Sequence, residues 1–462
     1  MITMQSLKEK RKLIAAIFTL AGPTMLEEFL HTAVQYIDTA MVGSLGTVAT
    51  AAVGSTSTVN WLVSSTVSAL GIGFLAVIAR AYGAGDKKKA ADAASQAVTV
   101  ALAAGAVLTV ITLSLSKAVP VLMNIDPEIR DIASKYFFII YTPMVFRAAE
   151  IIFSTVFRAS GDSRTPMFAG IAVNAVNIIL NFLLIYPTRE VGLFGCTFTI
   201  YGAGFGVLGA AAATAISYAA GGIIMTVKLF SHPELSPRGR SLKPNMQYLK
   251  PVFRIAVPNM CQRFCTSFGY VAFAGIINSL GKVSTAAHTV ANTVESAFYI
   301  PGYGMQSAAA TLAGNALGAR DGRRMREQMR VNLALEVLLM TVSGTLLFIF
   351  APQLSGIFSK DAEVIGLSSR VLRMVAVSEP VYGVSIIIEG VLLGVGNTKT
   401  PFKFNVICMW GVRILGTFIF AYIMNGTLVS AWGCMIGNNV MLFVLYITYY
   451  FKGKWNPLKE VS

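Results

Sequence analysis

The first apolar segment of the chain, residues 13–43, carries ionisable side chains that could move protons or hold a cation. Glu27, His31 and Asp38 are spaced i, i+4 and i+11, so they share one face of a helix, and Gln35 borders that face. An ionisable group in a spanning helix costs roughly 2.5–3.5 kcal/mol, so the pattern favours a proton relay or the wall of a wet cavity. The alternative is that these side chains pair with neighbouring helices and only stiffen the packing.

The chain contains a repeat with a fixed offset. Pro23 recurs as Pro258, 235 residues later, and the same offset relates residues 44–46 to 279–281. It also carries the Gly-Ala-Gly-Asp motif at 83–86 onto Gly-Ala-Arg-Asp, and Gly161-Asp162 onto Gly396-Asn397. Several matches in one register do not arise by chance. Two halves with one plan, in an apolar chain, are typical of a secondary transporter whose substrate path lies between them.

Composition indicates an all-α polytopic membrane protein. Of the 462 residues 55% are hydrophobic and only 13% are charged, against about a quarter in average proteins. Apolar runs of about 20 residues recur, and each is long enough to cross a bilayer core of about 30 Å. We expect twelve transmembrane helices, at 13–43, 48–81, 90–118, 128–157, 165–187, 204–229, 248–280, 284–316, 327–352, 362–394, 400–424 and 427–451.

Six helices per half is an even number, so both halves enter the membrane in the same orientation. That predicts two six-helix bundles related by a pseudo-twofold axis along the membrane normal. The predicted organisation is an N-terminal lobe, a proline-rich cytoplasmic linker acting as a tether, a C-terminal lobe and a cytoplasmic tail, at 1–230, 231–247, 248–452 and 453–462. The first helix is too long for a signal-peptide core, so we expect it to be retained.

The net charge of +15 does not require a nucleic-acid partner, because attraction to anionic lipid explains it. Lys and Arg collect in alternate loops, which predicts a multi-pass protein of the cell inner (cytoplasmic) membrane with both termini in the cytoplasm. The five cysteines follow no metal-ligand pattern, and no phosphate-loop motif is present, so an ATP-driven pump is disfavoured. We expect a monomer with no enzymatic activity, no metal and no cofactor.

Several motifs carry a family resemblance. The first helix ends in Tyr-Ile-Asp-Thr-Ala-Met-Val-Gly at 36–43, the Gly-Ala-Gly-Asp motif and Arg-Ala-Ser-Gly-Asp-Ser-Arg-Thr-Pro at 158–166 follow, and the second half contains Ala287-His288. In these motifs, and across essentially its whole length, the chain resembles the multidrug and toxic compound extrusion (MATE) family. The resemblance implies a twelve-helix antiporter that expels organic cations and other amphiphiles in exchange for protons or sodium.

The resemblance also implies a cation-coupling site in the N-terminal lobe. Asp38 matches the coupling aspartate of helix 1, Thr214 matches a helix 6 threonine, and the helix 5 pattern Asn-x-x-x-Asp reads Asn177 and Asn181 here. One carboxylate, two amides and a hydroxyl could ligate sodium, and a buried carboxyl could bind a proton. Loss of the second acid weakens a sodium site more, so we favour protons and the DinF-like type over the sodium-coupled NorM type.

The second half departs from the sodium-coupled pattern, in which helices 7 and 10 carry acids. The segment 257–281 has none, and Tyr382 stands at the position of the helix 10 aspartate, although Glu379 and Glu389 lie nearby. A cation site in the second lobe is therefore in doubt, and the coupling role falls on Asp38.

The repeat suggests a contact between the lobes, since Arg263 is the repeat partner of Glu28. We hypothesise that the two side chains interact across the central cleft and bias one access state; the alternative is that each is satisfied within its own lobe. Aromatic faces and carboxylates suit a lipophilic cation. Candidates to line the substrate cleft are Asn60, Trp61, Tyr299, Tyr303, Gln306 and Glu389, although each aromatic residue could simply serve packing.

The sequence therefore favours a cation-coupled multidrug efflux antiporter that works by alternating access. Such a protein would exchange small amphiphilic or cationic substrates for a coupling ion. A flippase for lipid-linked precursors is the alternative. Such a cavity should be rich in arginine, and the membrane-embedded arginines here are few: Arg147, Arg263 and Arg413. An ion channel or a scaffold without coupled transport is a third reading.

Overall fold

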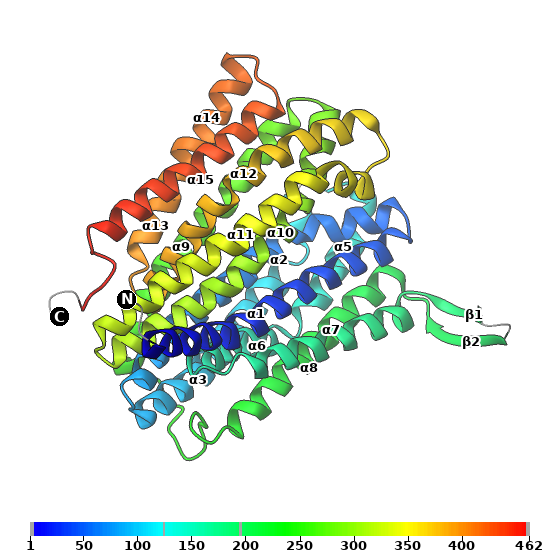
Figure 1. The fold of residues 1–462 in the computed structure, drawn as a ribbon. Coiled ribbons are helices and arrows are strands. Elements are labelled where there is room, and N and C mark those ends of the chain that lie inside the picture. Colours follow the sequence, from blue (N-terminus) through cyan, green and yellow to red (C-terminus); the bar gives the residue numbers. More distant parts are fainter. Residues whose placement is uncertain (1–3, 123–124, 194–195, 459–462) are drawn as a thin grey trace.

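The computed structural model describes residues 4–122, 125–193 and 196–458, and Figure 1 shows them as a bundle of long helices. The first half contains α1 (Met4–Gly43), α2 (Thr47–Gly83), α3 (Lys87–Leu115), the short α4 (Ala118–Leu122), α5 (Pro127–Tyr141), α6 (Met144–Ala159), α7 (Arg164–Leu184) and α8 (Gly206–Phe230). The second half contains α9 (Met246–Asn278), α10 (Lys282–Gly318), α11 (Gly322–Phe358), α12 (Ala362–Gly394) and α15 (Leu428–Phe451). Between α12 and α15, α13 (Lys399–Val406) continues through π-helical turns and α14 (Leu415–Phe418) to Ile423.

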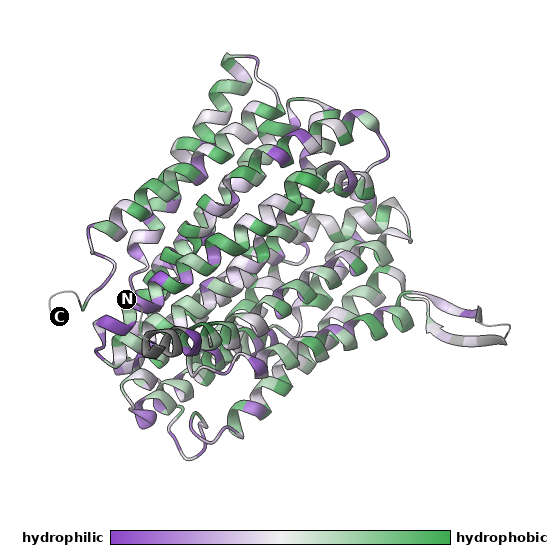
Figure 2. Cartoon of the chain, viewed as in Figure 1, coloured by the Kyte–Doolittle hydropathy of each residue, from purple (hydrophilic) through white to green (hydrophobic). Residues whose placement is uncertain are grey.

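Most of these helices are long and apolar enough to cross a membrane. Among the described residues nine pass that test alone, and the bent pair α5 and α6 makes a tenth span. The helices α9 and α10 are 33 and 37 residues long but more polar, and both pack against α2 of the other half. Polar side chains are tolerated there because protein rather than lipid surrounds them. The predicted class of twelve spanning helices in two bundles is confirmed, and Figure 2 shows apolar residues along the spans with polar ones near their ends.

The repeat is visible in the backbone of the turns. Gly46 and its repeat partner Gly281 have φ values of 107° and 101°, and Gly161 and Gly396 have 95° and 84°. Gly85 adopts φ 74°, whereas its partner is Arg320, which keeps the left-handed conformation at 56°. The left-handed conformation costs an L-residue other than glycine roughly 1–2 kcal/mol. The turn geometry is therefore retained even where its glycine is not.

The two halves pack around a pseudo-twofold axis. Replacing each helix by its repeat partner turns the packed pair α1–α10 into the packed pair α9–α2. The same replacement turns the pair α3–α9 into the pair α11–α1. Repeat partners Ala79 and Gly314 touch each other, since a Cβ at Gly314 would lie 2.7 Å from the Ala79 Cβ. A Cβ at Gly83 would lie 2.0 Å from the carbonyl oxygen of Asn315, and one at Gly318 would lie 2.0 Å from that of Arg80. The axis passes between the C-terminal ends of α2 and α10.

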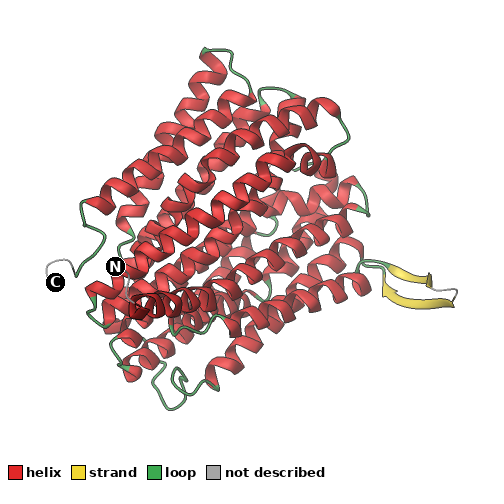
Figure 3. Cartoon of the chain, viewed as in Figure 1, coloured by secondary structure: helices red, strands yellow, loops and turns green. Residues whose placement is uncertain are grey.

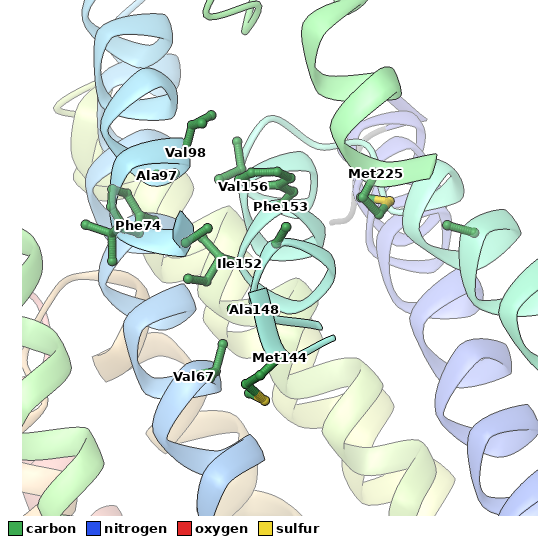
Figure 4. Close-up of a cluster of buried hydrophobic side chains, with 14 of the residues drawn as sticks. Val67, Phe74, Ala97, Val98, Met144, Ala148, Ile152, Phe153, Val156 and Met225 are labelled. Carbon is green, nitrogen blue, oxygen red and sulfur yellow. The ribbon is translucent and has the colours of Figure 1, made fainter. Parts of the chain in front are cut away.

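Two hydrophobic cores follow the same symmetry, since each includes a residue from the first helix of the other half. The N-half core packs α2, α3 and α6 together (Figure 4), and it includes Val252 from the start of α9. The core around Tyr446 of α15 includes Ile17 from the start of α1. Ile17 and Val252 are repeat partners, and both are fully buried. Each half therefore buries the beginning of the other half's first helix, which ties the halves together at the end where both helices begin.

The structure corrects several helix boundaries: α1 begins at Met4 rather than at residue 13, and the helix predicted at 327–352 spans Gly322–Phe358. The helix predicted at 128–157 is broken into α5 and α6, bent by 51° at Thr142-Pro143, because proline has no amide hydrogen to continue the helix. The helix predicted at 90–118 ends at Leu115 and is followed by α4. The helix predicted at 165–187 ends at Leu184.

Residues beyond Leu184 form an antiparallel hairpin that the sequence analysis did not predict, with strands β1 (Pro187–Leu193) and β2 (Cys196–Ala203). It projects from the end of the bundle opposite to the two chain termini, and it stands out in yellow in Figure 3. Alternating β-branched and aromatic residues in 196–201 were the available signal.

The linker expected to act as a loose tether lies against the N-terminal half. Glu234 forms an ion pair with Lys87 and accepts a hydrogen bond from Tyr82, at 2.6 Å, and Arg240 pairs with Asp92. The hydrogen bond from Lys87 holds the pKa of Glu234 below its usual range. These contacts make the described part of the linker a docked segment of the first half.

Candidate functional site

The four residues predicted to couple a cation lie together where α1, α7 and α8 meet. The side-chain amide of Asn181 donates to Asp38 Oδ1 at 2.6 Å and to Asn177 Oδ1 at 3.0 Å, and Asn177 Nδ2 donates to Thr214 Oγ1 at 3.3 Å. Asn177 and Asn181 are buried, at 4% and 1% exposure, whereas Asp38 is partly exposed. A single hydrogen-bonded chain therefore runs from the helix 1 carboxylate to the helix 6 hydroxyl.

The Asn177 amide fits this site in a second orientation. When it is turned, its nitrogen donates to both Asp38 carboxylate oxygens, at 2.8 and 3.2 Å, and its oxygen accepts from Thr214 at 3.3 Å. An amide carries two donors on one side and an acceptor on the other. With its nitrogen toward Asp38, Asn177 can donate to an ionised carboxylate. In the other orientation its oxygen faces Asp38 as an acceptor. Changing between the two needs no movement of the backbone.

The predicted proton-path residues are not joined to Asp38. Glu27 forms an ion pair with Arg158 of α6 at 2.7 Å, and both side chains are less than one-fifth exposed. His31 and Gln35 are exposed on α1. Among the described residues no hydrogen bond links the side chains of His31 or Gln35 to Glu27 or Asp38. Glu27 is therefore satisfied within the first half, and a relay along α1 would have to pass through water.

Two of the predicted cleft residues lie on α2. Asn60 Oδ1 accepts from Arg147 at 2.6 Å, and Arg147 also donates to Ser64 at 2.5 Å and lies over the Tyr218 ring at 4.2 Å. Trp61 is 48% exposed. The buried arginine and Asn60 thus form part of the polar interior of the first half.

The other predicted cleft residues gather on α10 and α12. The rings of Tyr299 and Tyr303 lie 5.8 Å apart, and the Tyr303 hydroxyl is 3.3 Å from that of Tyr382. Gln306 donates to the Ile386 carbonyl at 3.3 Å. Glu389 accepts from Gln262 at 2.7 Å and from Asn405 at 3.4 Å. The second half therefore presents a group of tyrosine rings from α10 and α12, and the hydrogen-bonded carboxylate of Glu389 lies on α12.

The hypothesised contact between the lobes is not a direct ion pair in this conformation. Arg263 Nε donates to Asn259 Oδ1, one turn earlier on α9, at 3.1 Å. Among the described residues Glu28 and Arg263 make no ion pair, although Glu28 is one of the charges that act on the Arg263 guanidinium. Their interaction in another access state stays a prediction.

Three buried acids of the second half were not picked out as a group by sequence reasoning. Glu295, Glu336 and Glu379 lie on α10, α11 and α12, at 7%, 0% and 2% exposure. Both carboxylate oxygens of Glu336 and one of Glu379 have no hydrogen-bond partner in the described structure. The available signal was an isolated acid in each of three apolar segments. No group of three His, Cys, Asp or Glu residues among those described could hold a metal ion.

Comparison with known proteins places these features in a family. The MatE family model matches two segments of the chain, residues 23–183 and 258–419, whose starts are separated by the repeat offset. A probable multidrug resistance protein NorM of Thermotoga maritima is 28% identical over 439 residues, covering 95% of this chain and 92% of that protein. A probable multidrug resistance protein YoeA of Bacillus subtilis is 26% identical over 438 residues, covering 94% and 92%.

The fold has close counterparts among solved structures. A crystal structure of MATE in complex with MaL6 superposes with a TM-score of 0.88 at 21% identity, covering 96% of this chain and 97% of that one. At this identity the likeness concerns the fold alone. The family model covers most of the chain in two copies, and the chain therefore belongs to the multidrug and toxic compound extrusion family of membrane transporters.

Proposed function

We propose that this transporter is an antiporter that exports small amphiphilic or cationic compounds in exchange for protons, with Asp38 as the coupling carboxylate. The hydrogen bond between Asn181 and Asp38, at 2.6 Å, carries the proposal. This bond brings a hydrogen-bond donor to the ionisable side chain of Asp38. That side chain lies between α1, which contacts the other half, and the interior of the first half.

The orientation of the amides supports protons over sodium. Sodium requires oxygen ligands, and Asn181 turns its nitrogen toward the carboxylate. Donors stabilise an ionised carboxylate, as the turned Asn177 would, whereas the unturned Asn177 keeps its oxygen toward Asp38 and accommodates a protonated one. The absence of an acid at Asn181 also leaves the site with less negative charge than the family pattern provides. The DinF-like, proton-coupled type is accordingly the one we favour.

Asp38 is placed where its charge can influence the two halves. The helix α1 packs against α7 of its own half and α10 of the other half. Tyr36, two residues before Asp38, donates to the Thr293 carbonyl of α10 at 3.1 Å. A proton on Asp38 weakens its attraction to the Asn181 amide, so α1 can shift against α7. Because α1 also contacts α10, that shift is transmitted to the interface that must open and close in alternating access.

The proposed substrates follow from the polar surfaces of α10 and α12. Tyrosine rings attract cations through their faces, and Tyr299, Tyr303 and Tyr382 lie together. The names of the relatives refer to multidrug resistance, which agrees with a broad surface of this kind. We place the protein in the cytoplasmic membrane with both termini inside, on the charge bias of its loops.

A lipid-precursor flippase is the less favoured alternative, because two embedded arginines already have partners. Arg147 is held by Asn60, Ser64 and the Tyr218 ring. Arg413 lies over the rings of Tyr270 and Phe273, at 4.8 and 4.1 Å. Arg147 cannot bind a diphosphate without giving up its hydrogen bonds, whereas Arg413 is held by ring contacts and its Nε has no hydrogen-bond partner in the described structure.

The proposal is tested with the purified protein in liposomes, with a lipophilic cationic dye as substrate and with proton and sodium gradients imposed separately. We expect the proton gradient to drive dye transport and the sodium gradient, at equal pH on both sides, to drive none. Transport driven only by sodium would overturn proton coupling. Transport of a fluorescent lipid diphosphate but not of the dye would favour the flippase.

A further inference from the structure

An apolar groove lies between the end of α11 and the beginning of α12, away from the centre of the bundle. Its volume is about 780 Å³. The lining is apolar except for a serine and two arginines, and consists of Phe348, Pro352, Ala362, Ile365, Gly366, Ser369, Arg370, Arg373, Met374 and Val377.

The groove faces the membrane. On α12 the exposed positions 366, 370, 373 and 377 follow helical spacing and form one stripe, whereas Val371, Leu372 and Val375 on the opposite side are fully buried. On α11 Phe348 is 46% exposed, and Val377 of α12 is 71% exposed. A surface this apolar on a spanning helix pair is covered by acyl chains.

Two of the four positions in this exposed stripe, Arg370 and Arg373, are arginines one turn apart. Arg373 Nε donates to the Phe348 carbonyl at 3.3 Å, and its guanidinium lies 5.7 Å from the Phe348 ring. Neither Arg370 nor Arg373 forms an ion pair with a carboxylate among the described residues. Arg370 is 8 residues into α12, about 12 Å along the helix from its first residue, so both arginines lie near one end of this span.

The first half has no equivalent of this pair. The repeat partner of Arg370 is Lys135, which forms an ion pair with Asp131 on the same helix, at 2.6 Å. The repeat partner of Arg373 is Phe138. The unpaired positive charge is thus specific to the α11–α12 surface and does not follow from the shared plan of the halves.

We propose that this groove binds one anionic phospholipid, with an acyl chain along the floor between α11 and α12 and the phosphate at Arg370 and Arg373. An apolar floor with unpaired arginines at its edge complements both parts of such a lipid. Arginine is the side chain best suited to a phosphate, because its donors match the phosphate oxygens in pairs. The lipid neutralises two charges that otherwise lie at the boundary of the hydrocarbon.

The test is native mass spectrometry of the full-length protein in mixed micelles holding equal amounts of phosphatidylglycerol and phosphatidylcholine with the same chains. We expect one phosphatidylglycerol to remain bound in preference to phosphatidylcholine. The variant R370Q/R373Q keeps the apolar floor and should lose the preference, by about fivefold for each arginine removed. The measurement does not depend on which way the protein faces in the membrane.

The matched control is K135Q, the repeat partner of R370Q. We expect it to bind phosphatidylglycerol as the wild type does, because Lys135 is already paired with Asp131. A large excess of inorganic phosphate should not displace the lipid, since it cannot fill the apolar floor; displacement would reassign the site to a free anion. Equal retention of the two lipids by the wild type, or an equal loss in K135Q, would overturn the proposal. Thermal unfolding of each variant verifies that it is folded.

Discussion

The two halves share a backbone plan but differ in how some of their buried acids are satisfied. In the first half Asp38 and Glu27 are each matched by a partner, Asn181 and Arg158 respectively. In the second half Glu336 is fully buried with neither carboxylate oxygen hydrogen-bonded. The repeat retains turns and helix crossings, because these depend on glycines and small residues, while the polar interior has diverged.

A comparison of repeat partners identifies residues in which the interiors of the two halves differ. Asn60, which is bound by Arg147, corresponds to Glu295, and Arg147 corresponds to Tyr382. A positive centre in one half is therefore replaced by an acid and a tyrosine in the other. The lesson is that the halves share one backbone plan and differ in the charges of their interiors, which agrees with the proposed division into a proton-coupling half and a substrate-binding half.

The largest effect is expected from breaking the paired acid of the first half. Glu27→Gln leaves Arg158 charged and buried without its ion-pair partner, which typically costs about 3 kcal/mol or more. The thermal midpoint in detergent should fall clearly. The double variant Glu27→Gln/Arg158→Met removes both charges and should recover much of the loss; an unchanged midpoint for the single variant would show that the pair contributes nothing.

A smaller effect is expected at the pseudo-twofold axis. Gly83→Leu and Gly318→Leu each place a side chain against a carbonyl oxygen of the other half, and overpacking of this kind costs about 1–3 kcal/mol. Because the positions are repeat partners, both variants should impair dye transport and lower the thermal midpoint to a similar extent. Gly43→Ala, where an added Cβ meets nothing within 4 Å, is the control. Strong damage from only one variant would contradict the symmetry of this contact.

A still smaller effect is expected from the unpaired acid of the second half. Glu336→Gln removes a carboxylate that has no described partner, so the thermal midpoint should stay the same or rise slightly. The contrast in sign with Glu27→Gln is the sharpest check of the difference between the halves. A loss as large as that of Glu27→Gln would mean that Glu336 is paired.

The smallest effect concerns the docked linker. His232 Nδ1 accepts from the amides of Glu234 and Leu235, at 3.1 and 3.0 Å, and burial lowers the pKa of His232 from its usual value of 6.5. Its stabilising contribution is therefore complete above about pH 6.5 and is lost as the pH falls toward the lowered value. Trypsin cleavage after Arg238 and Arg240 should accelerate below pH 6.5, once corrected for the pH dependence of trypsin on a peptide. His232→Asn should lack this dependence.

Much of the fold could be read from the sequence, because helix spans and a repeat in fixed register are local patterns. The meeting of Asp38, Asn177, Asn181 and Thr214 followed from a family resemblance rather than from spacing, since these residues lie on three helices. Contacts between side chains on different helices could not be predicted from the sequence, because nothing near Glu27 in the chain identifies Arg158 as its partner. The hairpin of β1 and β2 was missed because it follows an apolar helix after only two residues and lies in a loop between two spanning helices.

The most direct test of the account is proton-driven transport by Asp38→Asn in liposomes, measured beside exchange of labelled for unlabelled substrate without any gradient. We predict that the variant folds and exchanges substrate but loses gradient-driven transport by at least about 100-fold, since no titrating group remains at the end of α1. Surface variant Asp131→Asn should behave as wild type. Gradient-driven transport by Asp38→Asn at the wild-type rate would contradict the central role of this carboxylate.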